Sequence, residues 1–235
     1  MPPFIEFVRR VVAGDVADVN RHLAADPTLA TTASPVGAER QDASDYFFAS
    51  IAHYLYRGDT ALHMAAAAFQ RPIAELLVTH GASCRARNRR GAEPLHYAAE
   101  AHHWQPDTQA DVITYLVSAG ADPNALDGSG TAPLHRTVRT RSLPAVRALI
   151  DAGANPALRN GRGSTPLHLA VQTTGKSGSG LPLARAQQAG IIRFLLECGT
   201  KPTDVDGRGR QVRQAATSPW IRALLDDWQA AEKPR

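Results

Sequence analysis

The chain has 235 residues, a formal net charge of +4 and 43% hydrophobic residues, which is typical of an ordered protein with a sizeable core. Its two cysteines exclude a disulfide framework, and no uncharged apolar run is long enough to span a membrane. We therefore expect a cytoplasmic protein with no membrane partner. Arginine makes up 23 of the 26 basic residues, and its planar guanidinium suits the binding of carboxylate or phosphate.

The first 57 residues contain an amphipathic helix and a long link. The opening stretch, MPPFIEFVRR, interrupts its apolar residues with charge, so it predicts an amphipathic helix rather than a signal peptide. The link at about 31–57 ends in YFFASIAHYLY, which holds five of the 14 aromatic residues. We expect a short helix that covers the end of the neighbouring helices. The alternative is an aromatic wall at one end of a groove, with Tyr54 and Tyr56 facing a ligand.

Four similar segments follow the link, and each begins with a glycine. They read GDTALHMAA from residue 58, GAEPLHYAA from 91, GTAPLHRTV from 130 and GSTPLHLAV from 163, and each leads to an apolar helical block that closes on another glycine. The interval from a closing glycine to the next leading glycine is always ten residues. A constant joint of this kind predicts a hairpin that fixes how one unit stacks on the next.

All variation in length falls inside the units, at residues 100–111 and 172–190. Pro106 and Pro182 precede polar helical runs there, so we expect each of these second helices to begin early, after a loop. The two loops are either a secondary contact surface or tolerated extra length.

The repeat period, the tetrad TPLH at 165–168 and the closings GADPN and GANPA resemble the ankyrin repeat family, of the bacterial type. The resemblance implies an all-α solenoid of stacked helix-turn-helix units joined by β-hairpin-like loops. It implies one domain over residues 1–235, with an N-terminal capping helix pair at 4–30 and the aromatic-rich insertion at 31–57. After the insertion, the resemblance implies four full repeats, at 58–90, 91–129, 130–162 and 163–208, and then a C-terminal cap at 209–228.

One histidine stands in each tetrad, which raises the question of a metal site. Zinc requires its ligands around a single ion, whereas packed helices of successive units are roughly 10 Å apart, so we expect no metal. The resemblance implies instead that each imidazole bridges backbone groups of adjacent hairpins. Two tetrads lack the usual threonine. In the second unit Glu93 replaces it, and this carboxylate could form an ion pair with Arg89 or Arg90. The four histidines are His63, His96, His135 and His168.

The stretch AVQTTGKS at 170–177 has the outline of a phosphate-binding P-loop, with Ala170 in place of the first glycine. A working P-loop follows a buried strand and opens a helix. Here the preceding HLAVQ ends a predicted first helix, and IIRFLLE downstream lies where the other units have their second helix. We interpret 170–177 as a false positive, with Lys176 in a connecting loop, and predict no enzymatic activity and no cofactor.

Arginines cluster where the resemblance places the partner-binding surface, on the hairpin tips and first helices of a concave face. CRARNRR surrounds one hairpin, and HRTVRTR places Arg136 and Arg139 three residues apart on one helix face. We therefore predict a monomeric protein-binding scaffold with an acidic protein partner. The expected partner-binding residues are Tyr54, Tyr56, Arg57, Arg89, Arg90, Arg136, Arg139, Thr140 and Arg162.

Two other functions stay open. In the first, the chain is an enzyme or a small-molecule-binding protein, with an anion pocket between the aromatic residues 45–57 and the first helices, closed by Arg136 and Arg139. A deep cavity there would favour this hypothesis. Binding of nucleic acid ranks third, because the net charge is modest and few aromatic residues interleave with the arginines.

Overall fold

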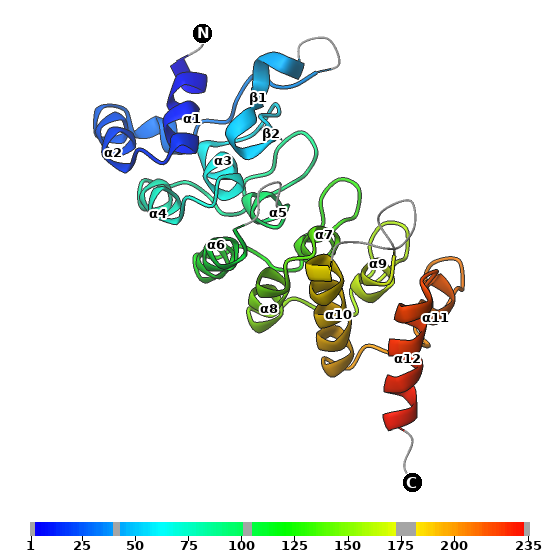
Figure 1. Cartoon of the computed structure of the whole chain (residues 1–235). Helices are drawn as coiled ribbons and strands as arrows, with labels where there is room; N and C mark the ends of the chain where they lie inside the picture. The colour runs from blue at the N-terminus through cyan, green and yellow to red at the C-terminus, as the bar shows by residue number, and fades with distance from the viewer. Residues whose placement is uncertain (1–2, 40–42, 101–104, 173–181, 233–235) are drawn as a thin grey trace.

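The computed structural model describes residues 3–39, 43–100, 105–172 and 182–232, which form a curved stack of helix pairs (Figure 1). In each pair the first helix is the shorter one, except in the first pair. The pairs are α1 (Pro3–Ala13) with α2 (Val16–Ala25), α3 (Ala61–Ala67) with α4 (Arg71–Thr79), α5 (Pro94–Ala98) with α6 (Pro106–Ser118), α7 (Pro133–Thr140) with α8 (Leu143–Asp151), α9 (Pro166–Ala170) with α10 (Pro182–Glu197), and α11 (Val212–Ala215) with α12 (Pro219–Glu232).

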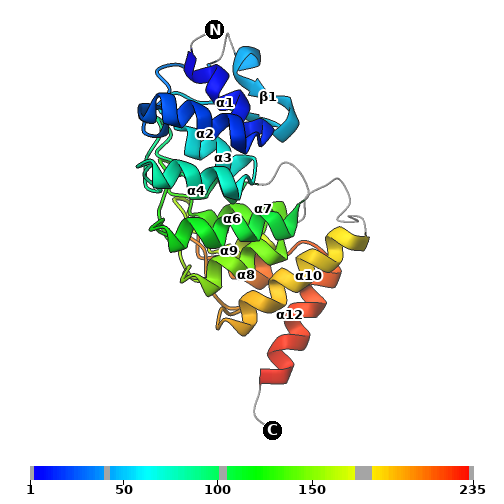
Figure 2. The same ribbon diagram turned by 90° about the vertical axis from the view of Figure 1, so that its left-hand side faces the viewer.

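The first helices form one layer of the stack and the second helices form another, as the two views show (Figures 1 and 2). One continuous apolar core runs between the layers from α1 to α12. Each full unit contributes the tetrad leucine to it, as Leu62, Leu95, Leu134 and Leu167, all of them buried. The all-α solenoid expected from the repeats is therefore confirmed.

The signals for helix ends are also confirmed. Pro94, Pro133 and Pro166 each occupy the first position of a helix, where a missing N–H leaves no hydrogen bond unmade. The two longer second helices begin at Pro106 and Pro182, as predicted. The chain before these prolines, at 101–104 and 173–181, lies outside the described residues.

The ten-residue joints, at 81–91, 120–130, 153–163 and 199–209, stack directly on one another. The backbone N–H of Arg89 donates to Arg57 at 3.0 Å, that of Gly128 to Arg90 at 2.8 Å and that of Gly161 to Gly130 at 2.9 Å, in each case to the carbonyl oxygen. Because the first joint hydrogen-bonds to the link, and the second and third joints each bond to the joint before them, a change of length would break this ladder. The ladder explains why the joint length is constant.

An Asn or Asp three residues before each leading glycine shapes the joint. Its Oδ1 atom accepts hydrogen bonds from the backbone N–H groups two and four residues later, at 2.8–3.0 Å in all four joints. These residues are Asn88, Asp127, Asn160 and Asp206. Our sequence analysis missed them, although the signal, Asn or Asp at a fixed distance from the glycine, was present in the repeat.

The tetrad histidines join neighbouring units, as the resemblance implied. In each, Nδ1 accepts a hydrogen bond from the backbone N–H three residues earlier. Nε2 then lies 3.1–3.2 Å from a backbone carbonyl of the next unit, such as that of Ala92 for His63. Within the described ranges, no three His, Cys, Asp or Glu side chains are grouped as a metal site would require.

The aromatic part of the link folds differently from our prediction of a short helix. It forms a hairpin of two short strands, β1 (Phe47–Phe48) and β2 (His53–Tyr54), with Phe47 opposite Tyr54. Single turns of 3-10 helix at Ala43–Tyr46 and Ala49–Ile51 flank and connect the strands. The short-helix prediction is wrong, because rings that alternate across a strand pair can pack against both the link and the first helices.

The region that imitates a P-loop does not follow a strand. Helix α9 ends at Ala170, and IIRFLLE lies within helix α10. Residues 173–177, including Lys176, are outside the described part of the chain. Among the helices that are described, none combines the length and apolar character needed to cross a bilayer.

Candidate functional site

The joints and first helices lie on the same side of the stack (Figure 1), and the surface between them contains two hollows. The larger, which we call the arginine groove, has a volume of about 470 Å³ and lies between the last three joints and helices α7 and α9. Its charged lining residues are Arg139, Arg141, Arg162, Asp206, Arg208 and Arg210. The smaller, the tyrosine pocket, has a volume of about 230 Å³ and is lined by Ala52, His53, Tyr54, Tyr56, Arg90, Ala92, Tyr97, Glu100 and Arg136.

The arginine groove carries an excess of positive charge. Its one lining acid, Asp206, forms an ion pair with Arg210 at 2.9 Å. Hydrogen bonds from the backbone N–H groups of Arg210 and Arg208 contribute to a pKa of about 2 for Asp206, so it is ionised at neutral pH. Among the described residues, no carboxylate lies within ion-pair distance of Arg139, Arg162 or Arg208. These three guanidinium groups are therefore available to an anion.

The joint geometry fixes where the arginines of the tips lie. Arg90, Arg162 and Arg208 all occupy the position two residues after the joint Asn or Asp, and each backbone N–H is held by that side chain at 2.8–2.9 Å. Ser129 occupies the equivalent position in the second joint. Three of the four joints thus present an arginine from an equivalent and rigid backbone position.

Two adjacent arginines at the tyrosine pocket have different roles, and only the second, Arg90, lines it. Arg89 donates to Glu39 at 2.9 Å and to the carbonyl oxygen of Ala38 at 2.6 Å, so it ties the joint to the link. The guanidinium of Arg90 lies over the ring of Tyr56, 4.4 Å from its centre, closer than that of Arg89 at 5.8 Å. This distance is typical of a cation–π interaction, which leaves the edge of the guanidinium open.

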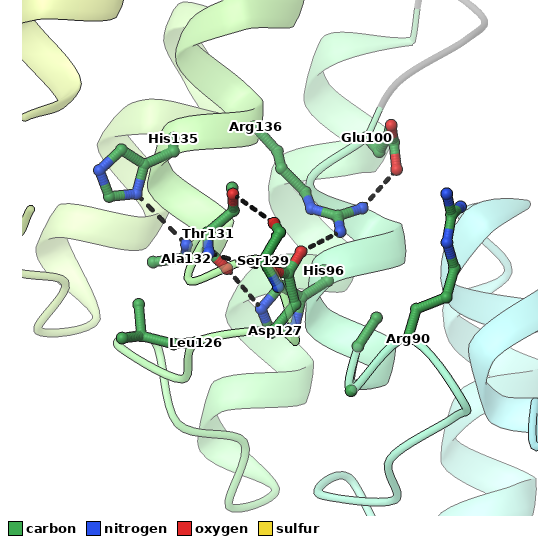
Figure 3. A network of polar contacts seen from close by, with 12 residues as sticks. Arg90, His96, Glu100, Leu126, Asp127, Ser129, Thr131, Ala132, His135 and Arg136 are labelled. Carbon is green, nitrogen blue, oxygen red and sulfur yellow. Dashed lines mark hydrogen bonds and ion pairs between the residues drawn. The ribbon is translucent and has the colours of Figure 1, made fainter. Parts of the chain in front are cut away.

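Arg136 is half-buried between two carboxylates (Figure 3). It donates to Asp127 at 2.6 Å and, on its other side, to Glu100. Burial by itself would raise the pKa of Asp127, but hydrogen bonds from Ser129, Thr131 and Arg136 lower it to about 2. Arg136 lines the pocket, but its charge is compensated from within the chain.

Tyr97, which lines the tyrosine pocket, belongs to a buried polar cluster. The Tyr97 hydroxyl lies 2.8 and 2.9 Å from the two carboxylate oxygens of Asp59, and the Asn88 amide donates to the same carboxylate at 2.7 Å. Burial, with the charge of Asp59 as a further cause, raises the pKa of Tyr97 well above its usual value. The hydroxyl is thus occupied, and the ring of Tyr97 is the part that meets the pocket.

The structure divides the nine expected partner-binding residues into three groups. Tyr54, Tyr56, Arg90 and Arg136 line the tyrosine pocket, and Arg139 and Arg162 line the arginine groove. Arg57, Arg89 and Thr140 line neither hollow. The Thr140 hydroxyl donates to the carbonyl oxygen of Thr137 within its own helix, at 3.1 Å.

Glu93 does not form the ion pair with Arg89 or Arg90 that we considered from the sequence. It is buried at the start of α5, and one carboxylate oxygen has no hydrogen-bond partner among the described residues. Burial raises its pKa, while the nearby charges of Arg85 and Arg87 act in the opposite direction.

Comparison with known proteins supports the repeat structure. A family model described as ankyrin repeats, in three copies, matches residues 37–127 and again residues 104–206. Among curated proteins, the E3 ubiquitin-protein ligase KEG of Arabidopsis thaliana is 38% identical over 81 residues. That match covers 34% of this chain and only 5% of the ligase.

Proposed function

The chain belongs to the ankyrin repeat family, whose repeats form protein–protein interaction scaffolds, and from this premise we propose that it binds an acidic segment of a partner protein in the arginine groove. The observation that carries the proposal is that Arg139 of helix α7 and Arg162 and Arg208 of the last two joints line one hollow, without a carboxylate of the described chain beside them. We also propose that the protein is monomeric, cytoplasmic and without enzymatic activity.

Charge complementarity supports an acidic partner. Guanidinium groups bind carboxylates through paired, charge-assisted hydrogen bonds, and three of them on one surface favour a segment with several acidic side chains. The joints hold two of these arginines on rigid backbone, so little conformational freedom is lost when a partner binds. Polar residues that also line the groove, such as Asn160 and Ser164, can bind the backbone of the segment.

The proposal can be tested with a fluorescein-labelled peptide of alternating Glu and Ser, and with the same peptide carrying Gln in place of Glu. We expect the full chain to bind the acidic peptide, with an affinity that falls as salt is raised. The double variant Arg139→Glu, Arg162→Glu should weaken binding at least tenfold in fluorescence anisotropy, since it replaces attraction with repulsion.

A matched control is Arg9→Glu with Arg193→Glu, which makes the same change in net charge at two exposed arginines on α1 and α10 that do not line the groove. This control should bind nearly as the unaltered chain does. Equal weakening by the two double variants would show non-specific attraction and contradict the proposal. It would be overturned as well if the Gln peptide bound equally well, or if a single-stranded oligonucleotide of the same charge bound more tightly.

A further inference from the structure

The tyrosine pocket is separate from the arginine groove, and helix α7 lies between them. Arg136 of α7 lines the pocket, whereas Arg139, about one turn later, lines the groove. The pocket is enclosed by the β1–β2 hairpin on one side and by α5 and α7 on the other.

Arg90 is the positive group that the pocket offers to a ligand. Its backbone is fixed by Asn88, its guanidinium is stacked on Tyr56, and no carboxylate of the described chain lies within ion-pair distance of it. The ring covers one face of the planar guanidinium, so its edge can donate two parallel hydrogen bonds to a carboxylate. Figure 3 shows Arg90 extending from its joint next to the Arg136 cluster.

The second arginine of the pocket does not compete with Arg90 for an anion. Arg136 is already bound by Asp127 and Glu100, and these two carboxylates together outweigh its charge. Glu100 is half-exposed at the pocket, so it opposes a bound anion there. Neutralising Glu100 should therefore strengthen the binding of a carboxylate, which a purely structural role for Glu100 would not predict.

The remaining walls are aromatic. Tyr54 and Tyr56 are half-buried, and the rings of Tyr97 and His53 are buried, with their centres 4.5 Å apart. The Tyr97 hydroxyl is turned to Asp59, so ring surface rather than a polar group meets a ligand. A volume of about 230 Å³ is suited to a group of the size of one aromatic side chain.

From this combination we propose that the tyrosine pocket binds a carboxylate carried on a small aromatic body. The carboxylate is bound by Arg90, and the apolar body lies against Tyr54 and Tyr97. A free aromatic carboxylic acid and the C-terminal residue of a partner chain offer the same chemistry. The proposal does not rest on the function proposed for the arginine groove.

Phenylacetate is a suitable probe, titrated into the full chain while the backbone amide signals of Arg90 and Ala92 are followed by NMR. We expect saturable shifts at these amides, and none with the neutral analogue phenylacetamide. Arg90→Gln should weaken binding at least tenfold and Arg90→Lys by less, since lysine keeps the charge but loses the planar stack. Glu100→Gln should strengthen binding severalfold.

Arg57→Gln is the matched control, because Arg57 is an exposed arginine close in sequence to Tyr56 and lines neither hollow. It should leave the affinity unchanged, and the groove variant Arg139→Glu, Arg162→Glu should do the same. The latter result separates this site from the arginine groove. The proposal would be overturned if Arg57→Gln and Arg90→Gln lost the same affinity for phenylacetate, or if phenylacetamide bound as well as phenylacetate.

The source of the carboxylate is distinguished by two short peptides that end in phenylalanine, one with a free C-terminus and one amidated. If the free peptide binds at least tenfold more tightly than phenylacetate, and the amidated one does not bind, the pocket takes a partner's C-terminus. If phenylacetate binds as tightly as the free peptide, the pocket takes a free acid. Binding of the amidated peptide equal to that of the free one would contradict both.

Discussion

The Nε2 atom of His96 lies 3.1 Å from the carbonyl oxygen of Thr131, which belongs to the next unit of the stack. The Nδ1 atom of the same ring accepts a hydrogen bond from the backbone N–H of Glu93 at 3.1 Å. Since Nδ1 accepts, the ring is neutral and its single proton is on Nε2, where it is donated to Thr131. Protonation of Nδ1 would turn it into a donor that faces another donor, the backbone N–H of Glu93. The ring would then be displaced and the connection between units weakened.

This relationship predicts that the stack loses stability in mild acid. Burial, together with the charge of Arg136, lowers the pKa of His96 from 6.5 to about 4, and burial also lowers the pKa of His63, His135 and His168. The unfolded chain therefore binds more protons than the folded chain below pH 6.5. The stabilisation is complete above pH 6.5 and is lost as the pH falls toward 4, by about 3 kcal/mol for His96 alone.

Urea unfolding followed by circular dichroism at pH 7.5, 5.5 and 4.5 measures this effect. The variant His96→Gln, which has no imidazole to protonate, should be less stable at pH 7.5 but should depend less on pH. A free energy of unfolding that stays constant between pH 7.5 and 4.5 would show that the histidines do not stabilise the stack as neutral donors.

A second prediction concerns the ion pair between Arg136 and Asp127. Arg136→Met should lower the free energy of unfolding by about 2 kcal/mol, because it leaves a carboxylate whose side chain is only 6% exposed without its charge partner. Asp127→Asn removes the charge but keeps the Oδ1 acceptor, and Asn88 and Asn160 show that asparagine forms the same joint. In the Asp127→Asn background, the substitution Arg136→Met should therefore lower the free energy of unfolding by less. Urea denaturation of the four proteins gives the coupling, and strictly additive losses would argue against it.

A third prediction separates two glycines of one unit. Gly153 closes a helix with φ of 95° and has open space around the position of a Cβ atom, so Gly153→Ala should cost about 1–2 kcal/mol for the left-handed backbone alone. Gly130 has φ of 73°, and a Cβ atom there would lie 2.8 Å from the Cα and N atoms of Gly161 in the next joint. Gly130→Ala should cost roughly 3 kcal/mol or more, because it also pushes two joints apart. Chemical denaturation of both variants tests the difference, and equal losses would mean that the contact between joints is not tight.

Most of the fold could be predicted from the sequence because its determinants are local and recur in every unit. The first-position prolines, the closing glycines and the tetrad histidines each act over a few residues or on the adjacent unit, so their spacing alone places them. The aromatic link has no such repetition. Its strands are two residues long, too short for an alternating pattern, and its position depends on distant contacts such as that of Arg89 with Glu39. The division of the chain into units with the boundaries given above stays a prediction.

The candidate site was predictable to a lesser extent, for a related reason. The repeat fixes which residues reach the concave face, and so Arg139 and Arg162 could be assigned to it. Which arginines already have a partner depends on pairs far apart in the sequence. Arg136 meets a carboxylate 36 residues away, next to an insertion that the first and third units lack, and no periodic pattern indicates this contact.

The residue that follows the tetrad histidine has a wider consequence. Tyr97 and Arg136 occupy this place in successive units and contact Asn88 and Asp127 of their own joints, and Leu169, in the same place in the next unit, lines the arginine groove. At this place Met64 and Tyr97 are buried, whereas Arg136 and Leu169 are partly exposed, on a backbone that is the same in each unit. Exchanging these residues among the units would rearrange apolar, phenolic and cationic character along the surface while the helices keep their positions, so new selectivity can arise in this protein by single substitutions.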